Sequence, residues 1–149
     1  MKRLMMGLGA MVILWAVQAQ AAEVTWQKEI KPLFEKRCAG CHGADSPELG
    51  EFKKDKKKWT DRGIGMRMDS YSHLITFIGW PDSGALMRRL DDGSGKADKK
   101  PGNMYQHLGA NEAERHANLE VVKAWVGNWN LKRWKDVTKE ELSALKVVY

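Results

Sequence analysis

The stretch KRCAGCHGAD, Lys36–Asp45, contains both cysteines of the chain, and it decides the fold that we expect. Two cysteines separated by two residues occur in dithiol redox sites, in zinc sites and at covalent attachment points for haem. A structural zinc site needs four ligands, and the chain has neither a second cysteine pair nor a suitably spaced histidine pair. A thioredoxin-type dithiol belongs to a strand–helix pattern that this sequence lacks. A disulfide that closes so small a loop would add little stability.

The residue after the second cysteine separates these alternatives. His42 completes the sequence C-x-x-C-H, which is the attachment signal of c-type haem. Two thiols at this spacing can add to the two vinyl groups along one edge of a porphyrin, and the next residue then directs its imidazole at the iron. We therefore expect Cys38 and Cys41 to hold one haem c through thioether bonds, and His42 to be the proximal iron ligand.

The N-terminus predicts export. A positively charged start precedes an apolar run of about 14 residues, positions 4–17, which is shorter than the ~20 residues of a membrane-spanning helix. The small-x-small sequence Ala19-Gln20-Ala21 then fits a signal-peptidase site. We expect residues 1–21 to be a cleaved signal peptide and residues 22–149 to be one periplasmic domain with no membrane span. An uncleaved membrane anchor is the alternative.

The charge of the chain argues against nucleic acid as a partner. The formal net charge is +6, and it falls to +4 when Lys2 and Arg3 leave with the signal peptide. The densest positive run, Lys53–Lys58, is expected to be solvated. The balance is thus only mildly basic.

Apolar residues recur at three- and four-residue spacing, which favours helices over strands. The clearest helix starts at Asn111, where Asn111 and Glu114 form a possible capping box, and Thr138 and Glu141 repeat that pattern near the C-terminus. The sequence predicts an all-α domain of four to five short helices, in segments leading into Cys38 and within 71–78, 83–90, 111–129 and 138–145. The glycine- and charge-rich stretches 48–65 and 91–103 are expected to be loops.

Three segments together resemble a known family. EIKPLFEKRCAGCHG at 29–43, WPDSGALMRRL at 80–90 and NLEVVKAWV at 118–126 are similar to the small class I-type monohaem cytochromes c, in particular the exported bacterial ones. The resemblance covers Glu29–Trp129. It implies a cytochrome c-like fold around one covalently bound haem, with a helix before the haem motif crossing the C-terminal helix. Residues 48–65 and 130–149 have no counterpart in that pattern, and we interpret them as a loop insertion and a C-terminal extension.

The same resemblance implies a methionine as the second axial ligand, from a loop before the last core helix. Met104 follows the loop KKPGN and stands seven residues before Asn111, so it is our predicted distal ligand. It departs from the family pattern because Tyr105, rather than a proline, follows it. Met87 lies in a helical segment and is expected to pack in the core.

Other ligands remain open. Met66 and Met68 come only 24 and 26 residues after His42, which is a short path around a haem. His107 lies three residues beyond Met104, and an open coordination site is a further alternative. A haem propionate is expected to pair with a tryptophan and an arginine, for which the candidates are Trp59 or Trp80 and Arg67 or Arg88.

These expectations define an electron carrier rather than an enzyme. The haem iron would cycle between Fe(III) and Fe(II) without binding substrate, and redox partner proteins would dock transiently. The alternative is a haem c subunit of a larger periplasmic oxidoreductase or respiratory complex, so the protein is expected to be a monomer or a subunit. The unmatched segments 48–65 and 130–149 are the features that suggest the alternative.

Overall fold

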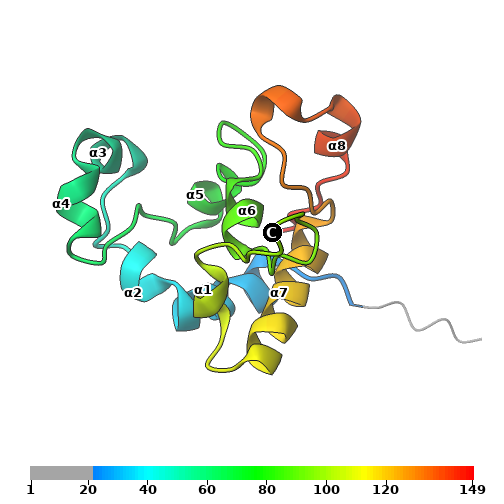
Figure 1. The fold of residues 1–149 in the computed structure, drawn as a ribbon, viewed down its shortest axis with the longest axis horizontal. Coiled ribbons are helices and arrows are strands. Elements are labelled where there is room, and N and C mark those ends of the chain that lie inside the picture. The colour runs from blue at the N-terminus through cyan, green and yellow to red at the C-terminus, as the bar shows by residue number, and fades with distance from the viewer. Residues whose placement is uncertain (1–21) are drawn as a thin grey trace, which may run out of the picture.

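The computed structural model of the chain describes residues 22–149 (Figure 1). The expected signal peptide, residues 1–21, lies outside the described residues. Within residues 22–149, all regular structure is helical. None of the helices in this range has the length and apolar character needed to cross a membrane.

The elements are short, apart from one helix of 15 residues. In chain order the described residues form η1 (Trp26–Ile30), α1 (Lys31–Arg37), α2 (Ala39–His42), α3 (Leu49–Lys54), α4 (Lys56–Thr60), α5 (Tyr71–Ile75), α6 (Ala85–Leu90), η2 (Tyr105–Leu108), α7 (Glu112–Val126), η3 (Trp134–Asp136) and α8 (Lys139–Ser143). Helical segments therefore occur in each of the regions where the apolar spacing predicts them.

The segment before the haem motif is a π-helical turn that continues into an α-helix. The Thr25 side chain caps η1 by accepting the Lys28 N–H, and Pro32 lies in the first turn of α1, where its missing N–H is tolerated. The Cys38 N–H donates to the Phe34 carbonyl at 2.7 Å, which ends α1, and α2 follows directly. The C-x-x-C-H motif therefore continues from α1 as the short helix α2.

The core lies between η1 and α7 (Figure 1). Leu119, Trp125 and Val126 of α7 are completely buried, and the Trp26 ring of η1 lies 6.2 Å from the Trp125 ring, measured between centroids. The stripe expected on α7 is therefore the core, and the segment before the motif packs against the last long helix, as the resemblance implies.

The C-terminal residues return to this core. The Val148 carbonyl accepts both the Trp26 N–H and the Trp125 Nε1–H, each at 2.8 Å, and the Val147 N–H donates to the Trp125 carbonyl at 2.9 Å. The segment that we interpret as a C-terminal extension is consequently part of the fold: its last residues close the core over α7.

The prediction of a loop over residues 48–65 is wrong for most of that segment. It forms α3 and α4, which make a lobe beside the other helices, at the left of Figure 1. Glu48 and Glu51 form a capping box at the start of α3, and the Asp55 side chain accepts the Lys58 N–H at the start of α4. Phe52 is buried. Local capping and one buried phenylalanine therefore order a stretch whose composition is typical of a loop.

Capping at the two later helices follows the sequence closely. Thr138 and Glu141 make both bonds of a capping box. Asn111 caps α7 by accepting the Glu114 N–H at 2.9 Å, but the Glu114 carboxylate accepts the N–H of Ala110 instead of Asn111. The expected helix start is confirmed, and the reciprocal bond is shifted by one residue.

Candidate haem site

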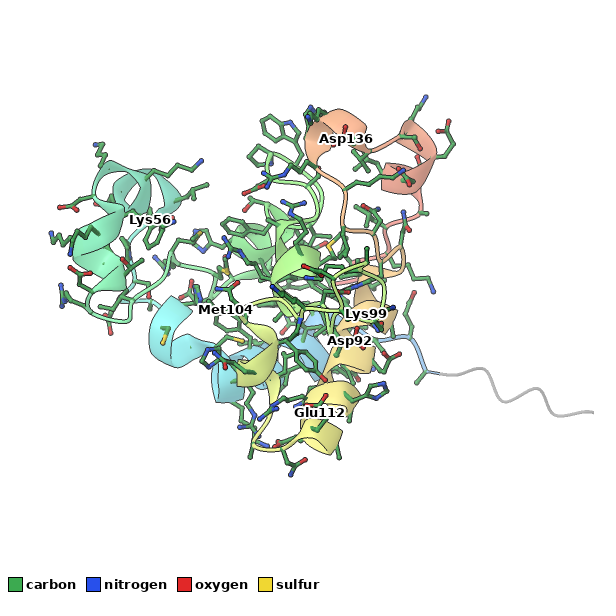
Figure 2. All side chains as sticks on the ribbon, in the orientation of Figure 1. Lys56, Asp92, Lys99, Met104, Glu112 and Asp136 are labelled. Atoms are coloured by element: carbon green, nitrogen blue, oxygen red, sulfur yellow. The ribbon has the colours of Figure 1, made fainter. Side chains whose placement is uncertain are left out.

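A cavity of about 1180 Å³ lies where α1, α2, the α3–α4 lobe, α6 and the segment around η2 meet. Its volume exceeds the ~300–1,000 Å³ typical of small-molecule pockets. Both cysteines, His42, Met66, Met68, Met104 and His107 line it, so the structure brings the predicted attachment residues and all the candidate iron ligands to one place. Figure 2 shows Met104 in the middle of the molecule and Lys56 on the separate lobe.

The His42 imidazole is fixed by the backbone behind it. Its Nδ1 lies 2.7 Å from the Met66 carbonyl oxygen, which can only accept, so Nδ1 carries the proton and Nε2 is left with a lone pair. A second backbone bond, from the Met68 N–H to the His42 carbonyl at 2.9 Å, holds the same segment in place. This arrangement fixes the tautomer that an iron ligand requires.

Gly65 allows the segment that contains Met66 to lie close to the His42 ring. A Cβ on Gly65 would lie 2.6 Å from His42 Nδ1 and 2.9 Å from Nε2, whereas ordinary contacts start near 3.4 Å. The Gly65 N–H also donates to the Cys41 carbonyl at 2.8 Å. The backbone of residue 65 therefore lies so close to the imidazole ring that a larger residue would collide with it.

The two cysteines lie at the junction of α1 and α2, line the cavity and are not joined by a disulfide. Burial, and secondarily the neighbouring Cys41, raises the pKa of the Cys38 thiol to about 11. Within residues 22–149, no group of three or more His, Cys, Asp and Glu side chains is placed to hold a metal ion. The thiols thus form neither a disulfide nor part of such a metal cluster, and both are directed to the cavity.

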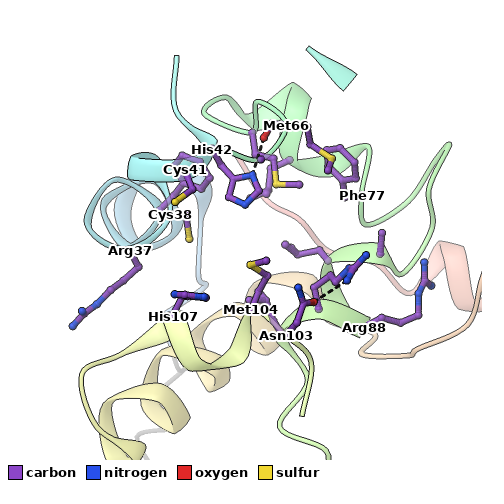
Figure 3. A pocket seen from close by; sticks show the side chains of 18 of the residues that line it. Arg37, Cys38, Cys41, His42, Met66, Phe77, Arg88, Asn103, Met104 and His107 are labelled. Atoms are coloured by element: carbon purple, nitrogen blue, oxygen red, sulfur yellow. Dashed lines mark hydrogen bonds between the residues drawn. The ribbon is translucent and has the colours of Figure 1, made fainter. Parts of the chain in front are cut away.

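Met104 lies across the cavity from His42. Figure 3 shows the two side chains pointing toward one another, with the cysteines to one side. The Met104 N–H donates to the Arg89 carbonyl at 2.9 Å, and the Gly102 N–H donates to the Asp91 carbonyl at 2.7 Å, so the loop 91–103 is closed by two backbone bonds immediately before Met104. A Cβ on Gly102 would lie 2.5 Å from the Arg88 carbonyl oxygen, which explains the glycine at this crossing.

The alternative ligands occupy other positions. Met66 and Met68 belong to the segment whose backbone is bonded to His42, and Figure 3 shows Met66 on the His42 side of the cavity. Met87 is 1% exposed and packs in the core, as expected. His107 lies on η2 and is exposed. Its backbone N–H donates to the Met104 carbonyl at 3.0 Å.

These residues fit a c-type haem. The cavity offers two thiols at one end, an imidazole nitrogen and a thioether sulfur from opposite sides, and an apolar wall that includes Phe34, Phe52 and Phe77. Next to Cys38, the buried Nε of Arg37 has no hydrogen-bond partner among the described residues, which is a cost that a polar group of a bound ligand would relieve.

Comparison with known proteins identifies the class. A helical fold around one C-x-x-C-H motif defines a monohaem cytochrome c. The sequence model of the PccH cytochrome c family matches residues 25–149, and the chain belongs to this family. The solved structure of monohaem cytochrome PccH from Geobacter sulfurreducens is 65% identical, with a TM-score of 0.82, and the match covers 86% of this chain and 100% of that chain. No curated protein matches.

Membership of this family confirms the cofactor and the general function. The protein carries one covalently bound haem c, and it functions in haem-based electron transfer as a carrier rather than an enzyme. The match also extends over both segments that have no counterpart in the class I pattern, residues 48–65 and 130–149.

Sequence reasoning missed four residues that line the cavity. Nothing in the sequence separates Arg89, Asn103 and Arg133 from other polar residues, and Gly65 ends a stretch whose composition is typical of a loop. Trp59 and Trp80, the tryptophans considered for a propionate, are not among the lining residues. No sequence signal marks Arg133, because it reaches the cavity only through the path of the C-terminal segment.

Proposed function

We propose that the protein is a periplasmic electron carrier in which His42 and Met104 are the axial ligands of the haem iron. Cys38 and Cys41 form the two thioether bonds, so that the haem stays attached in both oxidation states. The observation that carries this proposal is the bond from His42 Nδ1 to the Met66 carbonyl, with Met104 on the opposite side of the cavity.

Each residue contributes a separate physical effect. The carbonyl behind His42 keeps Nε2 directed at the cavity and makes the imidazole a stronger donor. A thioether ligand favours the ferrous form relative to a second imidazole, so Met104 would raise the reduction potential. The phenylalanines exclude water from the site. The haem supplies the one-electron chemistry, and the chain fixes its ligands so that little rearrangement accompanies electron transfer.

The ligand assignment is tested with holoprotein variants. Met104→Ala should abolish the sulfur-to-iron charge-transfer band of the ferric form and open the ferrous form to carbon monoxide. Met66→Ala, Met68→Ala and His107→Ala are matched variants in which the band should persist. Survival of the band in Met104→Ala, or its loss only in one of the other three, would show that another residue is the ligand.

Export is a second part of the proposal, supported by the sequence of residues 1–21. Thioether formation outside the cytoplasm is consistent with it. Selective disruption of the outer membrane, followed by mass spectrometry of the released haem protein, tests export. The mass should correspond to a mature chain that starts at Ala22. A chain that retains residues 1–21 and stays with the membrane fraction would indicate an anchored protein instead.

The alternative function, a haem-bearing subunit of a larger oxidoreductase, is favoured by one observation. Trp80 and Trp134 are 65% and 49% exposed, and tryptophan is enriched among the residues that contribute most to protein–protein binding. Gel filtration of untagged protein from its native source distinguishes the two functions. A stable complex at physiological salt supports the subunit, and elution as a free monomer supports the carrier.

A further inference from the structure

Among the charged side chains that line the haem cavity, positive ones predominate. Arg88, Arg89 and Arg133 line it together with the amide of Asn103. Figure 3 shows Arg88 and Asn103 across the cavity from Cys38 and Cys41. Asp82 is the one carboxylate among the lining residues, and it lies 3.4 Å from Arg88. The end of the cavity away from the cysteines therefore holds an excess of positive charge.

The Arg88 guanidinium forms hydrogen bonds with the backbone of the chain. Its Nη1 donates to the carbonyl oxygens of Ser83 at 2.9 Å and Lys132 at 2.7 Å. These bonds tie the loop before α6 to the C-terminal segment, immediately before Arg133. Burial, followed by the charge of Arg133, lowers the pKa of Arg88. Arg88 thus holds the C-terminal segment where Arg133 reaches the cavity, despite the repulsion between the two guanidinium groups.

Arg89 and Arg133 retain free donors. Arg89 uses Nη1 to donate to Asn103 Oδ1 at 2.8 Å, which leaves its other N–H groups and the Asn103 amide N–H groups available. None of the described residues forms an ion pair or hydrogen bond with the Arg133 guanidinium, which lines the cavity. Two guanidinium groups and an amide with unused donors make a site for carboxylates, because planar guanidinium groups bind carboxylates in pairs of hydrogen bonds.

We propose that Arg89, Arg133 and Asn103 bind the haem propionates and that Arg88 is a positioning residue that places Arg133. This inference rests on the proposed attachment of the haem at Cys38 and Cys41. The propionates of the porphyrin are on the edge away from the vinyl groups, so thioether bonds at the cysteines direct the two carboxylates toward the arginines. The segment 130–133 is then part of the haem site rather than only a surface for partners.

The positive charge of the arginines should also affect the reduction potential of the haem iron. Guanidinium groups stay charged at all accessible pH values, so they keep the propionates ionised and favour the ferrous iron. At constant electrode potential, Arg133→Met should raise the ferric-to-ferrous ratio by roughly tenfold at low salt. This is the order of the Coulomb effect of removing one unit charge from a partly solvated site with an effective dielectric constant of about 20. It should also raise the pKa of a propionate, because a neighbouring positive charge is lost, so that the potential varies more with pH between 5 and 8.

Spectroelectrochemical titration of the holoprotein at several pH values measures both effects. Lys135→Met is the control. It removes a positive charge two residues after Arg133, and the Lys135 side chain does not line the cavity, so neither the potential nor its pH dependence should change appreciably. Arg133→Lys should restore most of the wild-type potential. Arg89→Met should reproduce the pH dependence of Arg133→Met. In an Arg88→Met background, loss of Arg133 should have a smaller effect than in the wild type, because Arg88 acts through Arg133.

The result that overturns the proposal is a potential and pH profile of Arg133→Met and Arg89→Met that match those of Lys135→Met. Failure of the proposed function gives a different signature. If Met104 is not the ligand, the charge-transfer band identifies this in the wild-type background, while the effect of the arginines on pH dependence is still measured. A normal band together with unchanged profiles would refute the propionate site alone.

Discussion

Gly65→Ala tests how closely the backbone must approach the His42 ring. The new Cβ would lie closest to Cε1 of the ring and 2.6 Å from Nδ1, and ordinary contact starts at 3.4 Å, so the ring or the backbone has to move by at least about 0.8 Å, the shortfall at Nδ1. Overpacking of this kind costs about 1–3 kcal/mol. For a domain of this size, each kcal/mol lowers the melting temperature by about 4 °C. We expect a melting temperature about 4–12 °C lower.

The same displacement should weaken the bond from His42 Nδ1 to the Met66 carbonyl, and the Soret circular dichroism of the holoprotein should change with it. Gly50→Ala is the control, because its Cβ would meet nothing within 4 Å in α3. Alanine is better than glycine in a helix by about 0.5–1 kcal/mol, so this control should melt at or above the wild-type temperature. If Gly65→Ala behaves like Gly50→Ala in both measurements, the argument from close approach is wrong.

Three further predictions follow from single contacts. Gly102→Ala should shift the loop before Met104 and weaken the ferric charge-transfer band, because a Cβ there would lie 2.5 Å from a carbonyl oxygen of α6; an unchanged band would contradict this. The Ala110 N–H, followed by Arg37, lowers the pKa of Glu114 from 4.5 to about 2, so the carboxylate stabilises the fold above pH 4.5 and this contribution is lost as the pH falls toward 2. Glu114→Gln should therefore be less stable than wild type at pH 6 in urea denaturation, and this difference should shrink toward zero as the pH falls to about 2; a constant difference would refute the linkage. Trp125→Phe removes the bond to the Val148 carbonyl and part of the core, and it should cost about 1–3 kcal/mol in the same assay; a loss below 0.5 kcal/mol, on the order of a surface substitution, would be inconsistent with its burial.

Local signals account for the parts of the fold that the sequence predicts. The start of α7 at Asn111 and of α8 at Thr138 depends on caps formed by residues three positions apart, and these are visible in the sequence. The buried stripe on α7 follows from helical periodicity alone. The haem motif is equally local, because Cys38, Cys41 and His42 are nearly adjacent.

Residues that act through distant contacts could not be predicted in this way. The position of Arg133 depends on Arg88 binding the carbonyl of Lys132, 44 residues away in sequence. The role of Gly65 depends on how the chain returns to His42 after the α3–α4 lobe. The lobe itself was hidden by its composition, since its lysines and aspartates are typical of a solvated loop. Its order comes from capping bonds and from Phe52, which is buried.

The choice among the methionines shows why sequence separation is a weak guide to ligation. Met66 and Met68 follow the haem motif after 24 and 26 residues, and this path is used to bring backbone atoms of both residues to His42. The distal ligand must approach from the side of the cavity opposite His42. A residue whose backbone is bonded to His42 lies on the His42 side and is poorly placed for this. Met104 comes later in the chain, and bonds to α6 and to the end of that helix set its loop on the side facing His42. The backbone contacts of each methionine, rather than its distance from the motif, therefore favour Met104 as the distal ligand.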